Sequence, residues 1–238
     1  MSQPASTVDT LVSQQHTAEP VVQELTPALT RQWDAFVESC PDGTFFHLAG
    51  WKEVIETAFG HRGYYLLATS ADEITGVLPL IHISSRLFGN ALISVPFCAY
   101  GGVATANATV RTSLETTACA LAERLKVDYL ELRNRQARHP DWPCKQLYVT
   151  FRKTLDADPD ANLLAIPRKQ RAMVRKGIKA GLDAGWDDGI DRLYAAYSES
   201  VRNLGTPVFS KHHSVMSASH CVAYQAFIDL GELDEANW

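Results

Sequence analysis

The sequence lacks the features that mark several classes of protein. Its five cysteines form no CxxC pair, and no histidine stands at a zinc-finger spacing from any of them. Their odd number and irregular spacing favour free thiols in a reducing compartment over a disulfide framework. No catalytic motif surrounds any of them, and burial is expected for Cys98 and Cys119. The five are Cys40, Cys98, Cys119, Cys144 and Cys221.

Long apolar runs and a surplus of positive charge are also absent. The apolar stretches are far shorter than the ~20 residues that a membrane span needs. Residues 1–20 have neither the basic start nor the apolar run of a signal peptide. We therefore expect a cytoplasmic protein with no transmembrane segment, in which residues 1–20 form a disordered leader. The net charge of -5 means that a nucleic-acid role needs a local basic patch.

Hydrophobic periodicity and turn residues predict an α+β fold. The expected strands are 21–25, 64–69, 74–83, 91–95, 127–133 and 147–155, and the expected helices are 26–40, 48–58 and 109–125. This order predicts one mixed sheet flanked by helices, not a series of βαβ units. The run VDYLELR at 127–133 predicts a buried strand, in which Leu130 and Leu132 alternate with Tyr129 and Glu131 across the sheet.

The chain changes character after residue 156. The sequence DPD at 158–160 is typical of a helix start, and residues 166–182 contain six Arg or Lys and no acid. Apolar residues recur there at every fourth position, which predicts an amphipathic helix. This helix either contacts phosphate groups or is a solvated surface. A further helix is expected at 190–204. The cations expected on one face are Arg168, Arg171, Arg175 and Lys179.

The histidines and glycines form no recognisable catalytic motif. His47, His61 and His82 stand apart, and no carboxylate pairs with any of them at a recognisable spacing, so structural roles are favoured. Adjacent histidines on one segment, such as those near the C-terminus, rarely make a closed metal site without a carboxylate or cysteine partner, and no metal is expected. Gly101-Gly102 fits either a phosphate cradle or a tight turn that needs a positive φ. The C-terminal histidines are His212, His213 and His220.

Several blocks of the sequence, in the same order and spacing, resemble FemAB-like proteins of the N-acyltransferase superfamily. They lie between Val21 and Lys211 and are FFH followed by Trp51, VLPLIHISSRLFG, SVPFCAYGG, YLELRN, YVTFRKTL, IPRKQRAMVRKGIKAGL and NLGTPVFSK. The pattern is most similar to the subgroup associated with exosortase and PEP-CTERM exopolysaccharide loci. The resemblance implies two tandem GNAT-like domains, each a mixed β-sheet flanked by helices.

The resemblance also implies an activity. Relatives transfer an acyl or aminoacyl group to an amine acceptor, here a small molecule or an envelope or exopolysaccharide precursor. Acyl-CoA or aminoacyl-tRNA is the implied donor, no tightly bound cofactor is implied, and tRNA would contact the basic helix at 168–179. No catalytic residue follows. The substrate-binding residues that the resemblance implies are Trp51, Tyr100, Gly101, Gly102, Lys169, Arg171, Arg175 and Lys211.

The resemblance ends at Lys211. Residues 212–238 show no Fem-like pattern, and a histidine replaces the aromatic residue that follows this lysine in relatives. We therefore expect a first GNAT-like domain at 21–165, a basic linking helix with the start of a second domain at 166–211, and a poorly ordered tail. An incomplete second domain predicts little or no transferase activity for this chain. The alternative hypothesis is a non-enzymatic anion-binding protein that retains the basic helix.

Overall fold

The computed structural model describes residues 19–85, 89–145, 149–181 and 190–211. The expected tail at 212–238 and all of the expected leader except residues 19–20 therefore lie outside the described residues. The sequence RLFGN also predicts a turn at 86–90, of which residues 86–88 lie outside them. The strands are β1 (Val21–Glu24), β2 (Arg62–Ser70), β3 (Glu73–Ser85), β4 (Gly89–Ile93) and β5 (Tyr129–Glu131). The helices are α1 (Thr30–Ser39), α2 (Gly50–Phe59), α3 (Ala108–Leu125), α4 (Pro159–Ala165), α5 (Arg168–Lys179) and α6 (Asp191–Asn203), with single 3-10 turns η1 (Pro27–Leu29) and η2 (Phe45–His47).

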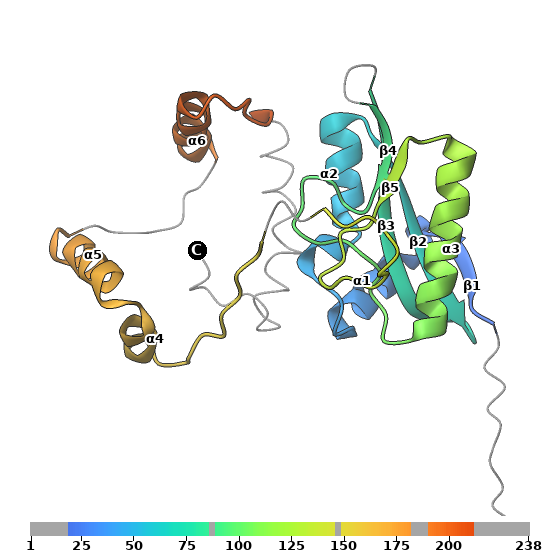
Figure 1. Ribbon diagram of the computed structural model, residues 1–238, viewed down its shortest axis with the longest axis horizontal. Helices are drawn as coiled ribbons and strands as arrows, with labels where there is room; N and C mark the ends of the chain where they lie inside the picture. The colour runs from blue at the N-terminus through green and yellow to red at the C-terminus, as the bar shows by residue number, and fades with distance from the viewer. Residues whose placement is uncertain (1–18, 86–88, 146–148, 182–189, 212–238) are drawn as a thin grey trace, which may run out of the picture.

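The sheet is mixed, as the sequence predicts. Its strands lie in the order β1-β2-β3-β4-β5, and each of the first three pairs antiparallel with the next (Figure 1). β4 and β5 pair in parallel, with Leu92 opposite Leu130. Parallel strands need a crossover connection, and α3 provides it. The α+β architecture of a mixed sheet flanked by helices is therefore confirmed.

The two faces of the sheet carry separate hydrophobic clusters, because successive side chains of a strand point to opposite faces. Tyr65 and Leu67 of β2 pack with Trp33 of α1 and Ile55 of α2 on one face. The opposite face packs against α3, whose predicted core positions are buried or partly buried. Figure 1 shows α1 and α2 on one side of the sheet and α3 on the other. The α3 side contains Tyr64, Leu66, Leu78, Leu80, Leu92, Leu114, Ala118 and Leu121.

Local sequence accounts for the ends of two of these helices. The side chain of Asn107 accepts hydrogen bonds from the backbone N–H groups of Thr109 and Val110, at 2.8 and 3.2 Å, and so caps the start of α3. Helix α2 ends at Phe59 and is followed by Gly60, where φ is 70°. A glycine takes this left-handed conformation without steric cost, which explains the helix end.

The strand predicted at 127–133 is shorter and less buried than expected. β5 has three residues, and Tyr129 is 52% exposed. The reason is its position: β4 pairs with one side of β5, and no described strand pairs with the other side. The predicted alternation is present, since Leu130 and Leu132 pack against the α3 cluster while Tyr129 faces solvent.

The prediction of a strand at 147–155 is wrong for residues 149–155, which form no regular structure. Val149 and Phe151 are 79% and 91% exposed. Strand propensity alone does not satisfy backbone hydrogen bonds, and no described strand lies alongside this segment. Burial of Cys98 is confirmed, whereas Cys119 on α3 is only partly buried because it lies beside the buried stripe of that helix.

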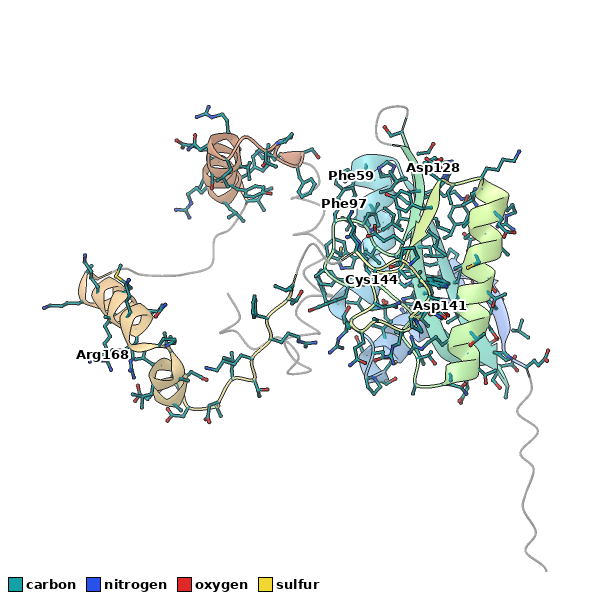
Figure 2. All side chains as sticks on the ribbon, in the orientation of Figure 1. Phe59, Phe97, Asp128, Asp141, Cys144 and Arg168 are labelled. Carbon is teal, nitrogen blue, oxygen red and sulfur yellow. The ribbon has the colours of Figure 1, made fainter. Side chains whose placement is uncertain are left out.

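The helices predicted after residue 156 are present as α4, α5 and α6. Asp158 caps α4 by accepting from the N–H of Asp160 at 2.9 Å. None of the three helices contains a buried residue. The described chain after α6 returns to α2, where Phe209 lies edge-on to Phe59 and Phe97; the latter two are labelled in Figure 2. No helix within the described ranges is long and apolar enough to cross a membrane.

We expect Leu114→Ala to lower the free energy of unfolding by about 2–5 kcal/mol, because the side chain is fully buried between α3 and the sheet. The matched control is Leu164→Ala on α4, whose side chain is 62% exposed and whose effect should stay within about 0.5 kcal/mol. Urea unfolding followed by circular dichroism measures both. Equal effects of the two substitutions would contradict the assigned core.

Candidate functional site

A pocket lies where β4 and β5 end. Ligands of sheets with parallel strands commonly bind at the carboxyl ends of those strands. Here the loop after β4, residues 94–107, and the segment after β5 line one pocket together with residues between α1 and η2. The loop returns to the sheet through a bridge between Ala104 and Val77 of β3. We call this site the arginine pocket; its residues are Asp42, His47, Tyr100, Gly102, Val103, Arg111, Arg133, Asn134, Arg135 and Arg138.

Glycine is required at 101 and 102 because neighbouring segments approach the backbone closely there, not because the backbone needs a positive φ. Neither glycine takes the left-handed conformation, so the interpretation as a tight turn that needs a positive φ is wrong. A Cβ on Gly102 would lie 1.9 Å from Oδ1 of Asn134. A Cβ on Gly101 would lie 2.7 Å from the carbonyl oxygen of Ser94. The glycines therefore let the loop after β4 pass directly against the segment after β5.

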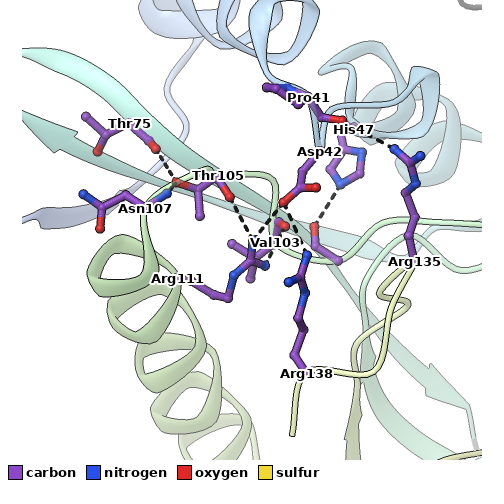
Figure 3. A network of polar contacts seen from close by, with 11 residues as sticks. Pro41, Asp42, His47, Thr75, Val103, Thr105, Asn107, Arg111, Arg135 and Arg138 are labelled. Carbon is purple, nitrogen blue, oxygen red and sulfur yellow. Dashed lines mark hydrogen bonds and ion pairs between the residues drawn. The ribbon is translucent and has the colours of Figure 1, made fainter.

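His47 is buried beside the pocket and fixes this loop from the other side. Its Nε2 lies 2.9 Å from the carbonyl oxygen of Gly102, a contact drawn as the dashed line from His47 in Figure 3. Its Nδ1 lies 2.8 Å from Oγ1 of Thr44. A carbonyl only accepts, so Nε2 carries the proton and Nδ1 accepts from the threonine hydroxyl. The indole N–H of Trp33 also donates to the His47 carbonyl at 2.7 Å. Both ring nitrogens are thus engaged, which leaves His47 no role as a general base.

Arg111 of α3 fastens the loop to the turn after α1. Its guanidinium donates to the carbonyl oxygens of Val103 and Thr105, at 3.0 and 2.8 Å. It also forms an ion pair of 2.9 Å with Asp42. Figure 3 shows Arg111 and Arg138 both directed at this carboxylate. Arg111 therefore has a structural role, since its donors are engaged by the protein.

Arg133 has a similar role on the opposite side of the loop. Its guanidinium lies 2.8 Å from Glu131 Oε1 and donates to the Cys98 carbonyl at 2.8 Å. This contact stabilises a strained stretch, because Val95 and Phe97 have φ of 48° and 70°, which are unusual for residues other than glycine. The backbone N–H of Arg133 also donates to the Ser94 hydroxyl at 2.6 Å.

Arg135 and Arg138 make weaker contacts with the protein. A donor of Arg135 lies 3.5 Å from the Pro41 carbonyl oxygen, and its guanidinium lies 5.9 Å from the ring centre of Tyr100. A nitrogen of Arg138 lies 3.8 Å from Asp42, whose carboxylate Arg111 already contacts at 2.9 Å. Both arginines are exposed at the mouth of the pocket.

The structure brings together only some of the substrate-binding residues expected from the sequence. Tyr100 and Gly102 line the pocket, and Gly101 adjoins it. Trp51 belongs to an adjoining aromatic group, in which Phe46 lies 5.9 Å from Trp51 and 6.5 Å from Tyr100, measured between ring centres. These residues come from α2, η2 and the loop after β4.

The basic residues expected at the site do not line the pocket. Lys169 and Arg175 are exposed on α5, and Arg171 of the same helix donates to the Leu164 carbonyl at 3.3 Å. Lys211 forms an ion pair of 2.5 Å with Asp191 at the start of α6. Their proposed contacts with substrate thus depend on a surface separate from the pocket.

Sequence reasoning missed most of the charged residues of the pocket. Asp42 and Arg111 stand far apart in the chain and belong to no motif, so nothing in the sequence linked them. The segment 133–138 does contain a signal, because three of its six residues are arginine. It follows directly on a predicted strand, the position at which site residues of parallel strands gather.

The buried thiols are unsuited to nucleophilic catalysis. Burial raises the pKa of Cys98 to about 12, and burial also raises the pKa of Cys40. A thiol with a raised pKa stays protonated near neutral pH, and the thiolate is the reactive form. Within the described ranges, no group of three or more His, Cys, Asp or Glu side chains is placed to hold a metal ion.

No family model and no curated protein matches this chain. Among solved structures, FemX is 20% identical over 45% of this chain, with a TM-score of 0.36. The chain spans about a quarter of FemX, 25% of its length. A transcriptional regulator from Bacillus halodurans C-125 is 12% identical over 71% of this chain and 97% of its own length, with a TM-score of 0.34. Similarity at this level carries no conclusion about function.

We expect His47 to make the protein less stable in acid. Burial lowers its pKa from 6.5 to about 4, so the unfolded chain binds a proton at this residue more readily than the folded chain. Its contribution to stability is therefore complete above pH 6.5 and is lost as the pH falls toward 4. Between pH 7 and pH 5 the loss should be about 2 kcal/mol.

Urea unfolding at both pH values measures this effect, with His47→Gln as the comparison. Glutamine does not titrate and can still donate to the Gly102 carbonyl. The variant should therefore lose about 2 kcal/mol less stability between pH 7 and pH 5 than the unmodified chain. An identical pH dependence in the two proteins would show that His47 is not the residue responsible.

Proposed function

We propose that this chain belongs to a FemAB-like N-acyltransferase, which transfers an acyl or aminoacyl group to an amine acceptor of the cell envelope or of an exopolysaccharide. The observation that carries the proposal is the arginine pocket at the carboxyl ends of the parallel pair β4 and β5. Tyr100 and Gly102, which the family resemblance implies in substrate binding, line this pocket. Of the proposed donors, acyl-CoA carries phosphate groups that arginine recognises, whereas the phosphodiester backbone of aminoacyl-tRNA would contact the basic helix α5.

The proposed reaction is direct attack of the acceptor on the donor. The amine nitrogen forms a bond to the acyl carbon, and the ester C–O or thioester C–S bond breaks. The amine releases a proton to solvent, and the departing oxygen or sulfur takes one up, so that the donor leaves as a hydroxyl or a thiol. Two observations support direct attack over a covalent enzyme intermediate. The thiol of Cys98 has its pKa raised to about 12, and His47 has both ring nitrogens engaged. The protein's contribution in this proposal is to position donor and acceptor.

The first test is donor binding. We expect the chain to bind acyl-CoA or a non-hydrolysable aminoacyl-tRNA analogue, and we expect Tyr100→Ala to weaken that binding about tenfold because the ring lines the pocket. The matched control is Tyr197→Ala on α6, whose side chain is 39% exposed. Product analysis with a labelled donor and a panel of amines measures transfer separately, and little or no product is expected from this chain. Binding of neither donor would overturn the proposal.

The alternative, an anion-binding protein that uses its basic helix, is favoured by one observation. The cations of α5 are exposed or half-exposed, and their helix contains no acidic residue and no buried one. Phosphate contacts of this kind are electrostatic and need no base-specific geometry. In this reading α5 binds tRNA or another polyanion without any transfer chemistry.

We expect the triple substitution of Arg168, Arg171 and Arg175 by Ala to weaken tRNA binding and to flatten its salt dependence, since each lost phosphate contact removes about 0.9 from the slope of log K against log salt. The matched control removes the same charge elsewhere, by substituting the exposed Arg31, Arg124 and Arg152 with Ala. Filter binding over a range of salt concentrations measures both. If the two triple variants bind tRNA equally well, the charges of α5 do not contact tRNA and are only solvated surface charges.

A further inference from the structure

The arginine pocket holds more positive than negative charge. Its four guanidinium groups contact two carboxylates among the described residues, those of Asp42 and Glu131. His47 adds no charge near neutral pH, because burial lowers its pKa to about 4. The carboxylate of Glu115, one turn beyond Arg111 on α3, lies 2.9 Å from Nε2 of His139 and does not line the pocket. The four guanidinium groups and the two carboxylates that they contact therefore leave two positive charges over, in a chain whose net charge is -5.

The surplus charge is located at two residues. Arg111 and Arg133 are engaged by carboxylates at 2.9 and 2.8 Å and by backbone carbonyls. Arg135 and Arg138, three positions apart, contact described protein groups only at 3.5 Å and 3.8 Å and across the face of an aromatic ring. Hydrogen bonds weaken steeply at such distances, so these two guanidinium groups retain donors for a ligand.

The ligand that fits the guanidinium groups of Arg135 and Arg138 is an anion with about two charges and several oxygens. A guanidinium group donates two parallel hydrogen bonds to the oxygens of a phosphate. A phosphomonoester carries about -1.5 to -2 charges at pH 7. A carboxylate or a phosphodiester carries about one charge and would leave part of the surplus unpaired.

We infer that Arg135 and Arg138 bind a doubly charged phosphate group, a phosphomonoester or the end of a diphosphate, on the substrate that enters the arginine pocket. That this phosphate belongs to a substrate rests on the proposed transferase function. Phosphate binding by the pocket can be measured whether or not the chain is a transferase. The ligand of the pocket is accordingly a small phosphorylated molecule, and a phosphodiester backbone does not bind at this site.

The experiment is a calorimetric titration of the full chain with inorganic phosphate and with pyrophosphate, at constant ionic strength. We expect saturable binding of both, and we expect the double substitution Arg135→Gln and Arg138→Gln to weaken it at least about tenfold. The matched control is Arg124→Gln, an exposed arginine on the last turn of α3, which should bind as the unmodified chain does. Both altered arginines of the pocket are exposed, so the fold is expected to be retained, and circular dichroism verifies this.

Four outcomes would overturn the inference. They are the absence of phosphate binding in the millimolar range, equal binding by the double variant and the control, equally tight binding of succinate, and displacement of phosphate by an RNA oligonucleotide without a terminal phosphate. Donor binding by the chain is measured separately. Loss of the phosphate site alone would therefore leave the proposed transferase intact, and loss of donor binding alone would leave the phosphate site.

Discussion

The passage of Gly102 between His47 and Asn134 is the contact on which the rest of the site depends. No side chain fits at this position, since a Cβ would lie 1.9 Å from the Asn134 amide oxygen. On the other side, the buried imidazole binds the Gly102 carbonyl oxygen at 2.9 Å. Three stretches of chain that are distant in the sequence thereby meet: the connection between α1 and α2, the loop after β4 and the segment after β5. The arginine pocket exists because these three stretches are held together.

The four arginines of the pocket differ in function because they differ in their partners. Arg111 and Arg133 act on backbone carbonyls of the loop after β4, which contains Val95 and Phe97 in left-handed conformations. Such conformations cost about 1–3 kcal/mol each and persist only where the surroundings enforce them. One pair of arginines thus holds the loop, and the other pair makes only longer contacts with described protein groups. A ligand would accordingly meet a site that is already formed.

The sequence predicted a helix or strand wherever the pattern of apolar residues within that one segment was sufficient. The apolar spacing of Leu114, Ala118 and Leu121 predicts α3, and the alternation along β2 and β3 predicts two buried faces. Strands that need a partner were less predictable, because pairing is a property of two segments. β5 is therefore shorter than VDYLELR indicates, and residues 149–155 form no strand despite their propensity.

The candidate site was predictable only in part, for a related reason. Tyr100 and Gly102 stand in one sequence block that the family resemblance covers, and both line the pocket. Asp42 and Arg111 are brought together only by the tertiary fold, so no spacing in the sequence reveals their ion pair. The glycines were recognised as special, but the physical reason, close approach of two segments, becomes visible only when both segments are placed.

The order of strands in the sheet has a consequence for how the chain folds. β2, β3 and β4 neighbour one another in space as they do in the sequence, and short connections join them, so their pairing costs little chain entropy. β1 pairs with β2 across a connection that contains α1 and α2, and β5 pairs with β4 across α3, so these two pairings have the longer sequence separations. We therefore expect the meander of β2, β3 and β4 to assemble first, and β1 and β5 to join it at its edges. Hydrogen exchange should accordingly be slowest at β2 and β3 and faster at β5, so that the pocket opens in local unfolding events while the meander stays folded.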